Sequence, residues 1–371
     1  MRISGAVLDE LERPRPYAES RPLTITELEL DGPGPNEVLV RIERAGLCHS
    51  DLSVIDGNRP RPVPMLLGHE ASGIVQELGS AVTDFAIGDR VVMTFLPRCG
   101  DCEGCDSNGL LPCRPGSAAN NAGTLLDGDI RLTRGGEPVS HHLGVSGFAT
   151  HAVVDTRSIV GVDADIPADV AALLGCAVLT GGGAVLNLAK PTDGNMIIVV
   201  GLGGVGMAAL LTAVAIGATV IGVDANPDKL VQALELGASE SFSPADATEH
   251  GLQAATVIEA AGNVRAFETA VALTAPGGTT ITVGLPAPTA FAQVSPLGLV
   301  AEARTIVGSY LGSAVPARDI PIFADLWRAG RLPVEKLVSR EIRLEDVNEA
   351  MDELADGRAL RQVIVFPSDV G

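Results

Sequence analysis

Six cysteines are the residues of this 371-residue chain that most clearly could bind metal or react. Four of them form one run, Cys99-x-x-Cys102-x-x-Cys105 followed by Cys113. Four thiolates at this spacing can enclose a tetrahedral zinc ion in a closed, structural site. An iron–sulfur cluster is the alternative, but its bacterial run ends C-x3-C-P, whereas here the last gap is longer and Arg114 stands in place of the proline. Zinc is therefore the favoured metal for a lobe at about 96–115, and a closed site explains stability rather than activity.

A second group of possible metal ligands comes earlier in the chain. The sequence reads C-H-S-D at positions 48–51 and G-H-E at positions 68–70. Cysteine, histidine and carboxylates gathered near strand ends indicate a metal, most plausibly zinc. Taken singly, Cys48 is typical of a small buried apolar residue and His69 of a hydrogen-bonded polar one. Only the combination supports a metal site.

The third chemical signal is a glycine-rich turn inside an uncharged stretch. The β-branched run 197–200 stops at Gly201, and Gly203 and Gly206 complete the pattern G-x-G-x-x-G. A helix-favouring segment and a second β-branched strand follow, and that strand ends on Asp224. Strand, glycine turn, helix, strand and acidic end together are typical of a dinucleotide-binding unit.

Each residue of this motif has a physical role. Gly201 allows the tight turn, Gly203 lets the backbone approach a pyrophosphate, and Gly206 lets the helix pack closely on the strand. The phosphates would bind free N–H groups at the helix N-terminus. Asp224 would accept hydrogen bonds from the adenosine ribose and repel a 2′-phosphate, which predicts NAD rather than NADP. A nucleotide-free α/β core and a membrane span are the alternatives, and the strand–turn–helix context disfavours both.

Length and charge limit the class of protein. A chain of 371 residues exceeds the size of one hydrophobic core, so two domains are expected. The net charge of −20 argues against binding to nucleic acid or to an anionic membrane. The N-terminus shows no apolar signal segment, so we expect a cytoplasmic protein with reduced cysteines.

The predicted elements place these motifs in an α/β protein. Residues 1 to about 92 alternate apolar and polar residues between Gly/Pro turns, which predicts an irregular β domain. A polar, glycine-rich loop is expected at 116–147 and a helix at 168–189. After Asp224 helices and strands alternate. The last 60 or so residues predict a helix at 345–354 and a strand at 362–366, which we expect to return to the first domain.

Together these motifs resemble the zinc-containing alcohol dehydrogenases of the medium-chain dehydrogenase/reductase superfamily. The resemblance covers the whole chain and includes C-H-S-D, G-H-E, the four-cysteine lobe, C-A-V-L-T at 176–180 and G-L-G-G-V-G at 201–206. It implies a GroES-like β-rich catalytic domain at 1–176 and 309–371, and a Rossmann domain with a doubly wound parallel sheet at 177–308.

The resemblance also implies a role for individual residues. The ligands of a catalytic zinc with an open fourth position would be Cys48, His69 and Cys176. The structural zinc would have Cys99, Cys102, Cys105 and Cys113. The residues implied in catalysis are Ser50, which takes the substrate proton, the carboxylates Asp51 and Glu70, and Thr180 beside the nicotinamide. The residues implied in NAD binding are His49, Gly201, Gly203, Gly204, Val205, Gly206, Asp224, Lys229 and Arg361. The substrate pocket would include Phe95 and His142.

Two features refine the resemblance. Many members have a histidine three residues after the relay serine, but this chain has Ser53, so the proton would leave through water. The long gap between Cys113 and Cys176 resembles the usually homodimeric branch, which includes class III enzymes that oxidise a formaldehyde–thiol adduct.

The expected activity is reversible hydride transfer between NAD and a primary, possibly aromatic, or secondary alcohol, with two zinc ions per chain. Two other functions stay open at this point. One is a zinc- and NAD-binding protein without turnover, against which the relay residues argue. The other is a thiol-adduct dehydrogenase or a formaldehyde dismutase-like enzyme.

Overall fold

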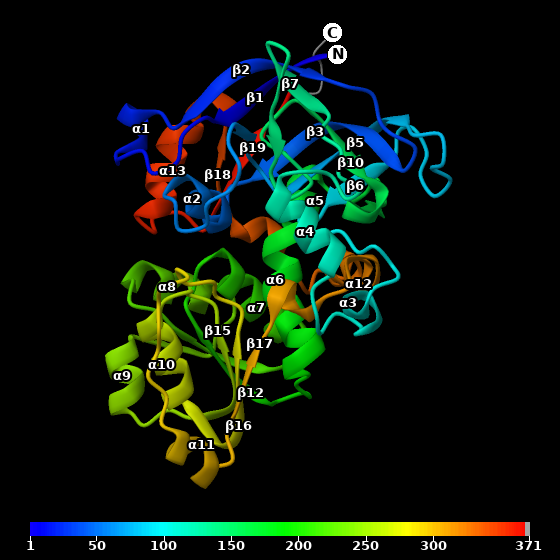
Figure 1. Ribbon diagram of the computed structural model, residues 1–371. Coiled ribbons are helices and arrows are strands. Elements are labelled where there is room, and N and C mark those ends of the chain that lie inside the picture. The colour runs from blue at the N-terminus through cyan, green and yellow to red at the C-terminus, as the bar shows by residue number, and fades with distance from the viewer. Residues whose placement is uncertain (368–371) are drawn as a thin grey trace. The chain divides into compact units, whose positions relative to one another are not determined.

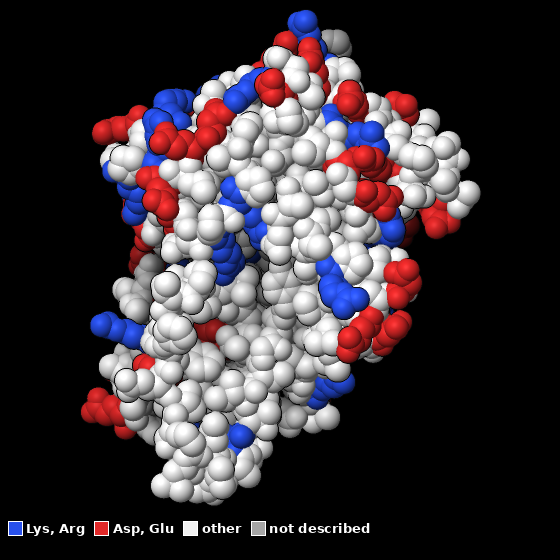
Figure 2. All heavy atoms as spheres, in the orientation of Figure 1, with Lys and Arg blue, Asp and Glu red and all other residues white. Residues whose placement is uncertain are grey.

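The computed structural model describes residues 1–367 and divides the chain into two compact units (Figure 1). Unit 1 comprises Met1–Cys176 together with the segment that begins at Val338, and unit 2 comprises Ala177–Leu337. On the face of unit 1 shown in Figure 2, acidic and basic side chains are interspersed. Both units combine sheets with helices, which confirms the predicted α/β class.

Unit 1 contains two mixed sheets. The first has the order β8 (Glu137–Pro138), β7 (Leu132–Arg134), β2 (Leu23–Leu30), β1 (Arg2–Leu8), β4 (Met65–Leu66), β9 (Ser140–His141). The second has the order β11 (Ile159–Val162), β6 (Arg90–Met93), β5 (Ala71–Leu78), β3 (Glu37–Gly46), β19 (Arg361–Val365), β18 (Val338–Ile342), and β10 (His151–Asp155) also pairs with β3. The helices are α1 (Tyr17–Ser20), α2 (His49–Ile55), α3 (Glu103–Asp106), α4 (Arg114–Ala122), α5 (Ala168–Leu173) and α13 (Val347–Ala355).

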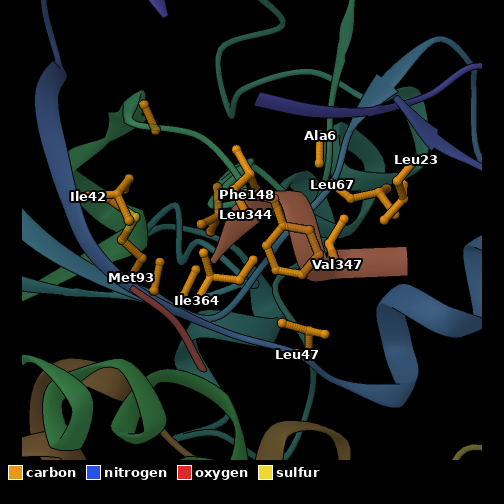
Figure 3. Close-up of a cluster of buried hydrophobic side chains, with 14 of the residues drawn as sticks. Ala6, Leu23, Ile42, Leu47, Leu67, Met93, Phe148, Leu344, Val347 and Ile364 are labelled. Carbon is orange, nitrogen blue, oxygen red and sulfur yellow. The ribbon is translucent and has the colours of Figure 1, made fainter. Parts of the chain in front are cut away.

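The core of unit 1 is formed by both ends of the chain. Ile42 and Phe148 come from the N-terminal half, whereas Val347 and Ile364 come from α13 and β19, and all four are fully buried in one cluster. Figure 3 shows these side chains packed together. The C-terminal segment returns to this unit because β19 pairs antiparallel with β3.

Unit 2 is a doubly wound parallel sheet. Its strand order is β14 (Glu240–Phe242), β13 (Thr219–Val223), β12 (Met196–Val200), β15 (Ala254–Glu259), β16 (Thr274–Thr282), β17 (Thr305–Gly308). This is the 3-2-1-4-5-6 order of a dinucleotide-binding fold. The helices are α6 (Leu179–Gly183), α7 (Gly204–Ala215), α8 (Pro227–Glu235), α9 (Pro244–Glu249), α10 (Val264–Ala272), α11 (Pro296–Ala301) and α12 (Pro316–Arg328).

The structure differs from the sequence prediction at the end of unit 2. The chain stays with this unit to Leu337 instead of leaving it at 308. Helix α12 packs Phe323 so closely on α6 that a Cβ at Gly182 would lie 2.6 Å from the ring. Arg318 also donates to the Asn187 side chain at 2.8 Å. These contacts connect segments far apart in sequence, so no local pattern indicated them.

A second difference lies in the predicted loop at 116–147. It begins inside helix α4 and contains the hairpin β7–β8. Helix α4 forms because Pro115 stands in its first turn and the Cys113 side chain accepts the Gly116 N–H at its N-terminus. A cysteine in this capping role is not one of the usual start signals for a helix.

Candidate functional site

The first ligand group is held by the start of helix α2. Cys48 is the N-cap residue of α2, and its backbone N–H donates to Asp51 Oδ2 at 3.1 Å. Asp51 Oδ1 lies 2.9 Å from His69 Nδ1, and both side chains are completely buried. The carboxylate therefore holds two of the predicted metal ligands at once, and His69 keeps Nε2 available for a metal.

His69 reaches this position through a tight turn between β4 and β5. Gly68 has a φ of +92°, and a Cβ there would lie 2.4 Å from the backbone nitrogen of Phe148. Glycine is required because an L side chain is strained at this φ and would collide with backbone. The turn directs the buried His69 and Glu70 toward the start of α2.

The third predicted ligand, Cys176, lies on a long buried helix. The helical segment runs from Ala168 to Ala189 and includes two π-helical stretches, of which η2 (Leu174–Val178) carries Cys176. A Cβ at Gly175 would lie 2.1 Å from the carbonyl oxygen of Met93, so the helix contacts β6 directly. The π-helical turn is frequent at functional sites, and the sequence contained no signal for it.

These side chains fit a zinc ion. The ligand atoms of Cys48, His69, Glu70 and Cys176 all lie within 4.8 Å of one another. Cys176 Sγ lies 3.5 Å from His69 Nε2, close to the roughly 3.6 Å that tetrahedral Zn–S and Zn–N bonds require. A hydrogen bond from Cys176 lowers the pKa of the Cys48 thiol well below its usual value, which favours the thiolate that binds metal.

Glu70 and Arg361 form a buried pair beside this cluster. Arg361 Nη1 lies 3.5 Å from Glu70 Oε2 and donates to the carbonyl oxygen of Leu47 at 3.1 Å. Neither carboxylate oxygen of Glu70 has a hydrogen-bond partner among residues 1–367. Burial raises the pKa of Glu70 to about 7, against the opposing effect of Arg361. Unsatisfied acceptors next to three predicted metal ligands suit a site that binds a cation.

Two aromatic rings flank the His69 imidazole, and they are the predicted pocket residues Phe95 and His142. Both meet it edge-on, with ring centroids 5.7 Å and 5.4 Å away respectively. His142 is buried, and its Nδ1 lies 3.2 Å from Asp51 Oδ1. The contact between His142 and Asp51 was not predicted, because the two residues are far apart in the chain.

Ser50 and Ser53 lie on the same short helix but have different surroundings. Ser50 Oγ is 3.9 Å from Cys48 Sγ, next to the metal ligands. Ser53 Oγ donates to the carbonyl oxygen of His49 at 2.7 Å, which is an ordinary bond inside a helix. His49 itself is exposed. The structure therefore places Ser50, and not Ser53, beside the predicted metal centre.

The four remaining cysteines form a separate cluster around α3 and the start of α4. Their Sγ atoms lie 3.7–3.9 Å apart for the pairs 99–105, 102–105 and 102–113. Zinc–sulfur bonds of about 2.3 Å in a tetrahedron place the sulfurs about 3.8 Å apart. Backbone N–H groups of Cys99 and Gly100 donate to the sulfurs of Cys113 and Cys105. The pKa of Cys102 is lowered to about 6, chiefly by a backbone hydrogen bond from Arg114. This geometry fits a closed zinc site.

In unit 2 the glycine turn joins β12 to α7. Gly201 has a φ of +90°, and a Cβ on Gly206 would lie 1.8 Å from the Gly201 carbonyl oxygen. A Cβ on Gly203, by contrast, would meet no protein atom within 4 Å. Packing therefore explains two glycines but not the third, whose open side suits a pyrophosphate at the α7 N-terminus.

Asp224 closes the same turn from the neighbouring strand. Its Oδ2 accepts the Leu202 N–H at 2.7 Å and its Oδ1 accepts the Asn226 N–H at 2.8 Å. The β12–β13 register makes this possible, because Val200 pairs with Val223 and both strands end together. Asn226 caps α8, as predicted, and Lys229 lies half-buried in its first turn.

Thr180 and Val205 are brought close within unit 2. A Cβ on Gly181 would lie 2.1 Å from the Val205 carbonyl oxygen, so α6 and α7 touch at this point. Thr180 is buried and Val205, with Gly204 before it, is half-buried at the start of α7. The adjacent positions of Thr180 and Val205 agree with a shared role at the nicotinamide, and this role stays a prediction. The pyrophosphate contacts of His49 and Arg361 also stay predictions.

One helix of the described chain is long and apolar enough to cross a membrane. It is the Ala168–Ala189 segment that carries Cys176, and 83% of its apolar window is buried inside the protein. Burial of this kind is typical of a core helix.

The fold and the two kinds of site define a zinc-binding, dinucleotide-dependent dehydrogenase, and comparison with known proteins agrees. The model of the alcohol dehydrogenase GroES-like domain matches residues 34–164, and that of the zinc-binding dehydrogenase matches residues 204–327. A Mycobacterium tuberculosis protein with the name "Putative alcohol dehydrogenase D" is 35% identical over 376 residues, covering 98% of this chain and 100% of its own.

Solved structures give the same result. An alcohol dehydrogenase zinc-binding domain protein from Burkholderia ambifaria is 31% identical with a TM-score of 0.91, covering 99% of each chain. Benzyl alcohol dehydrogenase from Acinetobacter calcoaceticus is 29% identical with a TM-score of 0.89, covering 99% of this chain and 100% of its own. The chain belongs to the zinc-containing alcohol dehydrogenase family of the medium-chain dehydrogenase/reductase superfamily.

Proposed function

We propose that this protein is an NAD-dependent zinc alcohol dehydrogenase that interconverts a primary or secondary alcohol with its aldehyde or ketone. The observation that carries the proposal is the convergence of Cys48, His69 and Cys176, with Ser50 Oγ only 3.9 Å from Cys48 Sγ. Three ligands leave a fourth zinc position open, as catalytic sites require. A closed structural site needs no hydroxyl at its edge.

The roles of the protein groups follow from their positions. When bound, zinc would supply Lewis acidity that lowers the pKa of an alcohol, and NAD would supply the hydride acceptor. Ser50 takes the hydroxyl proton as the hydride leaves the alcohol carbon. Asp51 holds His69 in the tautomer that presents Nε2.

An aromatic alcohol is the substrate class that we favour. Phe95 is buried against the imidazole of His69 and offers an apolar ring beside the metal ligands. Benzyl alcohol dehydrogenase, at 29% sequence identity, is also among the similar structures. Aromatic rings prefer edge-to-face or offset packing on one another, so a benzyl group suits such a wall.

A substrate panel tests the proposal directly. Purified protein with NAD is mixed with benzyl alcohol, linear primary alcohols and secondary alcohols, and NADH absorbance is recorded. Formaldehyde with and without a low-molecular-weight thiol is the comparison for a thiol-adduct enzyme. Absence of NADH with every alcohol, in protein that holds two zinc ions, would contradict the proposal.

The preference for NAD rests on Asp224. Asp224→Asn keeps one acceptor for the glycine turn but removes the charge that would repel a 2′-phosphate. Charges 4 Å apart near a protein surface repel by about 4 kcal/mol, so we expect the NAD-to-NADP ratio of kcat/KM to fall by at least about tenfold. Asp224→Ser would also loosen the turn, because the side chain accepts two backbone N–H groups.

Asp228, an exposed carboxylate in the first turn of α8, is the matched control for this variant. Asp228→Ser should leave the cofactor ratio unchanged, because its charge is not directed at the turn. Wild-type protein that already uses both cofactors equally would disprove the NAD assignment.

We further propose two zinc ions per chain, the second in the four-cysteine lobe. Cys102→Ala should lose this zinc and lower the thermal stability, because structural sites contribute folding free energy. A decrease of only about 2 kcal/mol in the free energy of unfolding corresponds to a fall in Tm of about 4–8 °C. Metal analysis and calorimetry measure both effects. Iron in the wild type, or an unchanged Tm in the variant, would contradict the assignment.

A homodimer is the oligomeric state that we propose. The segment 284–301 contains no charged residue, and Phe291, Leu297 and Val300 in it are 85%, 76% and 81% exposed. The part of unit 2 around α11 is mostly white in Figure 2, with little charge on the face shown. Strand β17 pairs only with β16 among the described strands, so its outer edge is open. An exposed apolar surface beside an open edge is suited to a second copy, and light scattering measures the mass.

A further inference from the structure

The unexplained residue beside the predicted metal centre is His142. It is 1% exposed, and it comes from the segment after β9, outside the turns that carry the metal ligands. Its Nδ1 lies 3.2 Å from Asp51 Oδ1, at ion-pair distance, and has no hydrogen bond of good geometry among residues 1–367. A buried ring nitrogen needs a partner, and the Asp51 carboxylate is an acceptor within reach of it.

The chemistry of the contact defines which atom carries the hydrogen. Asp51 accepts the Cys48 N–H and the His69 Nδ1–H, and a carboxylate at this point can only accept. His142 must therefore present Nδ1–H to it. The backbone holds the ring in place, because the His142 N–H donates to Ser146 Oγ at 3.0 Å.

Asp51 thus accepts two hydrogen bonds from proposed metal ligands, and His142 Nδ1 lies close enough, at 3.2 Å, to be a third donor. His142 alone contributes no ligand atom to the Cys48–His69–Cys176 cluster. Without it, Oδ1 would be held by His69 alone, and the carboxylate and imidazole could turn together. The Nδ1–H of His142, which comes from a different part of the chain, would restrict the movement of Asp51 Oδ1.

We propose that His142 is a positioning residue, whose Nδ1–H holds Asp51 so that His69 keeps its metal-binding orientation. The inference rests on the proposed zinc site. It adds to the pocket role that the resemblance implied, because one ring nitrogen of His142, Nδ1, lies beside a carboxylate. A packing role is the competing explanation, since the His142 ring also meets His69 edge-on.

Two substitutions separate these explanations. His142→Phe keeps the ring and its edge contact but removes the donor. His142→Asn removes the ring but keeps an N–H near the position of Nδ1. The nearby His141→Phe is the control for loss of a buried imidazole, because His141 Nε2 accepts the Arg131 N–H and does not contact Asp51.

The measurement is the rate at which zinc passes from the protein to a chromophoric chelator, together with the d–d spectrum after cobalt replaces the labile zinc. We expect His142→Phe to release zinc about tenfold faster, at the lower end of the effect of groups that orient metal ligands. His142→Asn should stay within about twofold of wild type and keep its cobalt spectrum. His141→Phe should lower Tm but leave zinc release unchanged.

Wild-type release from His142→Phe, or equally fast release from His142→Asn, would overturn the positioning role. If the phenylalanine variant is insoluble, His142→Leu provides the same comparison with His142→Asn. A wild type that holds only one zinc would overturn the proposed function itself. Two zinc ions with release unaffected by position 142 would overturn this inference alone.

Discussion

Replacing Cys176 with alanine should remove one zinc ion per chain and lower kcat by at least about 10³-fold, while the fold stays intact. Lewis acidity contributes several kcal/mol to the barrier, and each 1.36 kcal/mol is a factor of ten. The fold should persist because alanine is a good helix former and Cys176 lies inside the long buried helix. Metal analysis, kcat and NADH fluorescence measure the three parts of the prediction.

Cys102→Ala is the matched comparison, since it also removes one zinc ligand but from the other cluster. The two variants should have opposite profiles: Cys176→Ala loses turnover and keeps its stability, whereas Cys102→Ala loses stability first. NADH binding should be normal in Cys176→Ala, because the glycine turn belongs to unit 2. Residual turnover near the wild-type value would show that Cys176 is not a ligand of the catalytic metal.

Ser50→Ala should lower the rate of alcohol oxidation by about 10²–10⁴-fold, the usual contribution of a positioned proton acceptor. The affinity for NAD should change little, because Ser50 lies in unit 1 next to Cys48. Steady-state kinetics with a deuterated alcohol show whether the chemical step has become slower. Binding of NADH is measured separately by fluorescence.

Ser53→Ala is the control, because it removes a hydroxyl from the same helix. The Ser53 hydroxyl already donates to the His49 carbonyl oxygen, so its loss should leave kcat within about twofold of wild type. A large decrease in Ser53→Ala would mean that the proton passes through this residue. Equal effects of both variants would attribute the loss to the stability of α2.

The sequence predicted those parts of the molecule whose structure is determined by residues close together in the chain. The strand before Gly201 and the strand ending at Val223 were predicted almost to the residue, whereas the helix between them, predicted from Met207, begins at Gly204. Local patterns suffice there, because β-branched runs and glycine positions directly determine the backbone. The four-cysteine lobe could be predicted equally well from the sequence, since all four cysteines lie within a short segment.

Contacts between distant segments were not predictable in this way. The pairing of His142 with Asp51 depends on how two loops fold against each other, and nothing in either segment signals it. The π-helical turn at Cys176 arises where the helix meets β6, because Gly175 touches the Met93 backbone. Helix α4 was missed since its N-cap is a cysteine and not one of the common capping residues.

The buried carboxylate of Asp51 has a consequence for biosynthesis. It fixes the Cys48 backbone and the His69 ring through protein hydrogen bonds, which do not themselves require a bound metal. In the four-cysteine lobe the backbone N–H groups donate to the ligand sulfurs themselves, and structural zinc sites of this kind contribute folding free energy. If the chain binds two zinc ions as proposed, we expect it to need zinc during folding for the lobe, and at any later time for the catalytic site. In a zinc-poor cell we expect the first requirement to limit how much protein accumulates, and the second to limit how much of it is active.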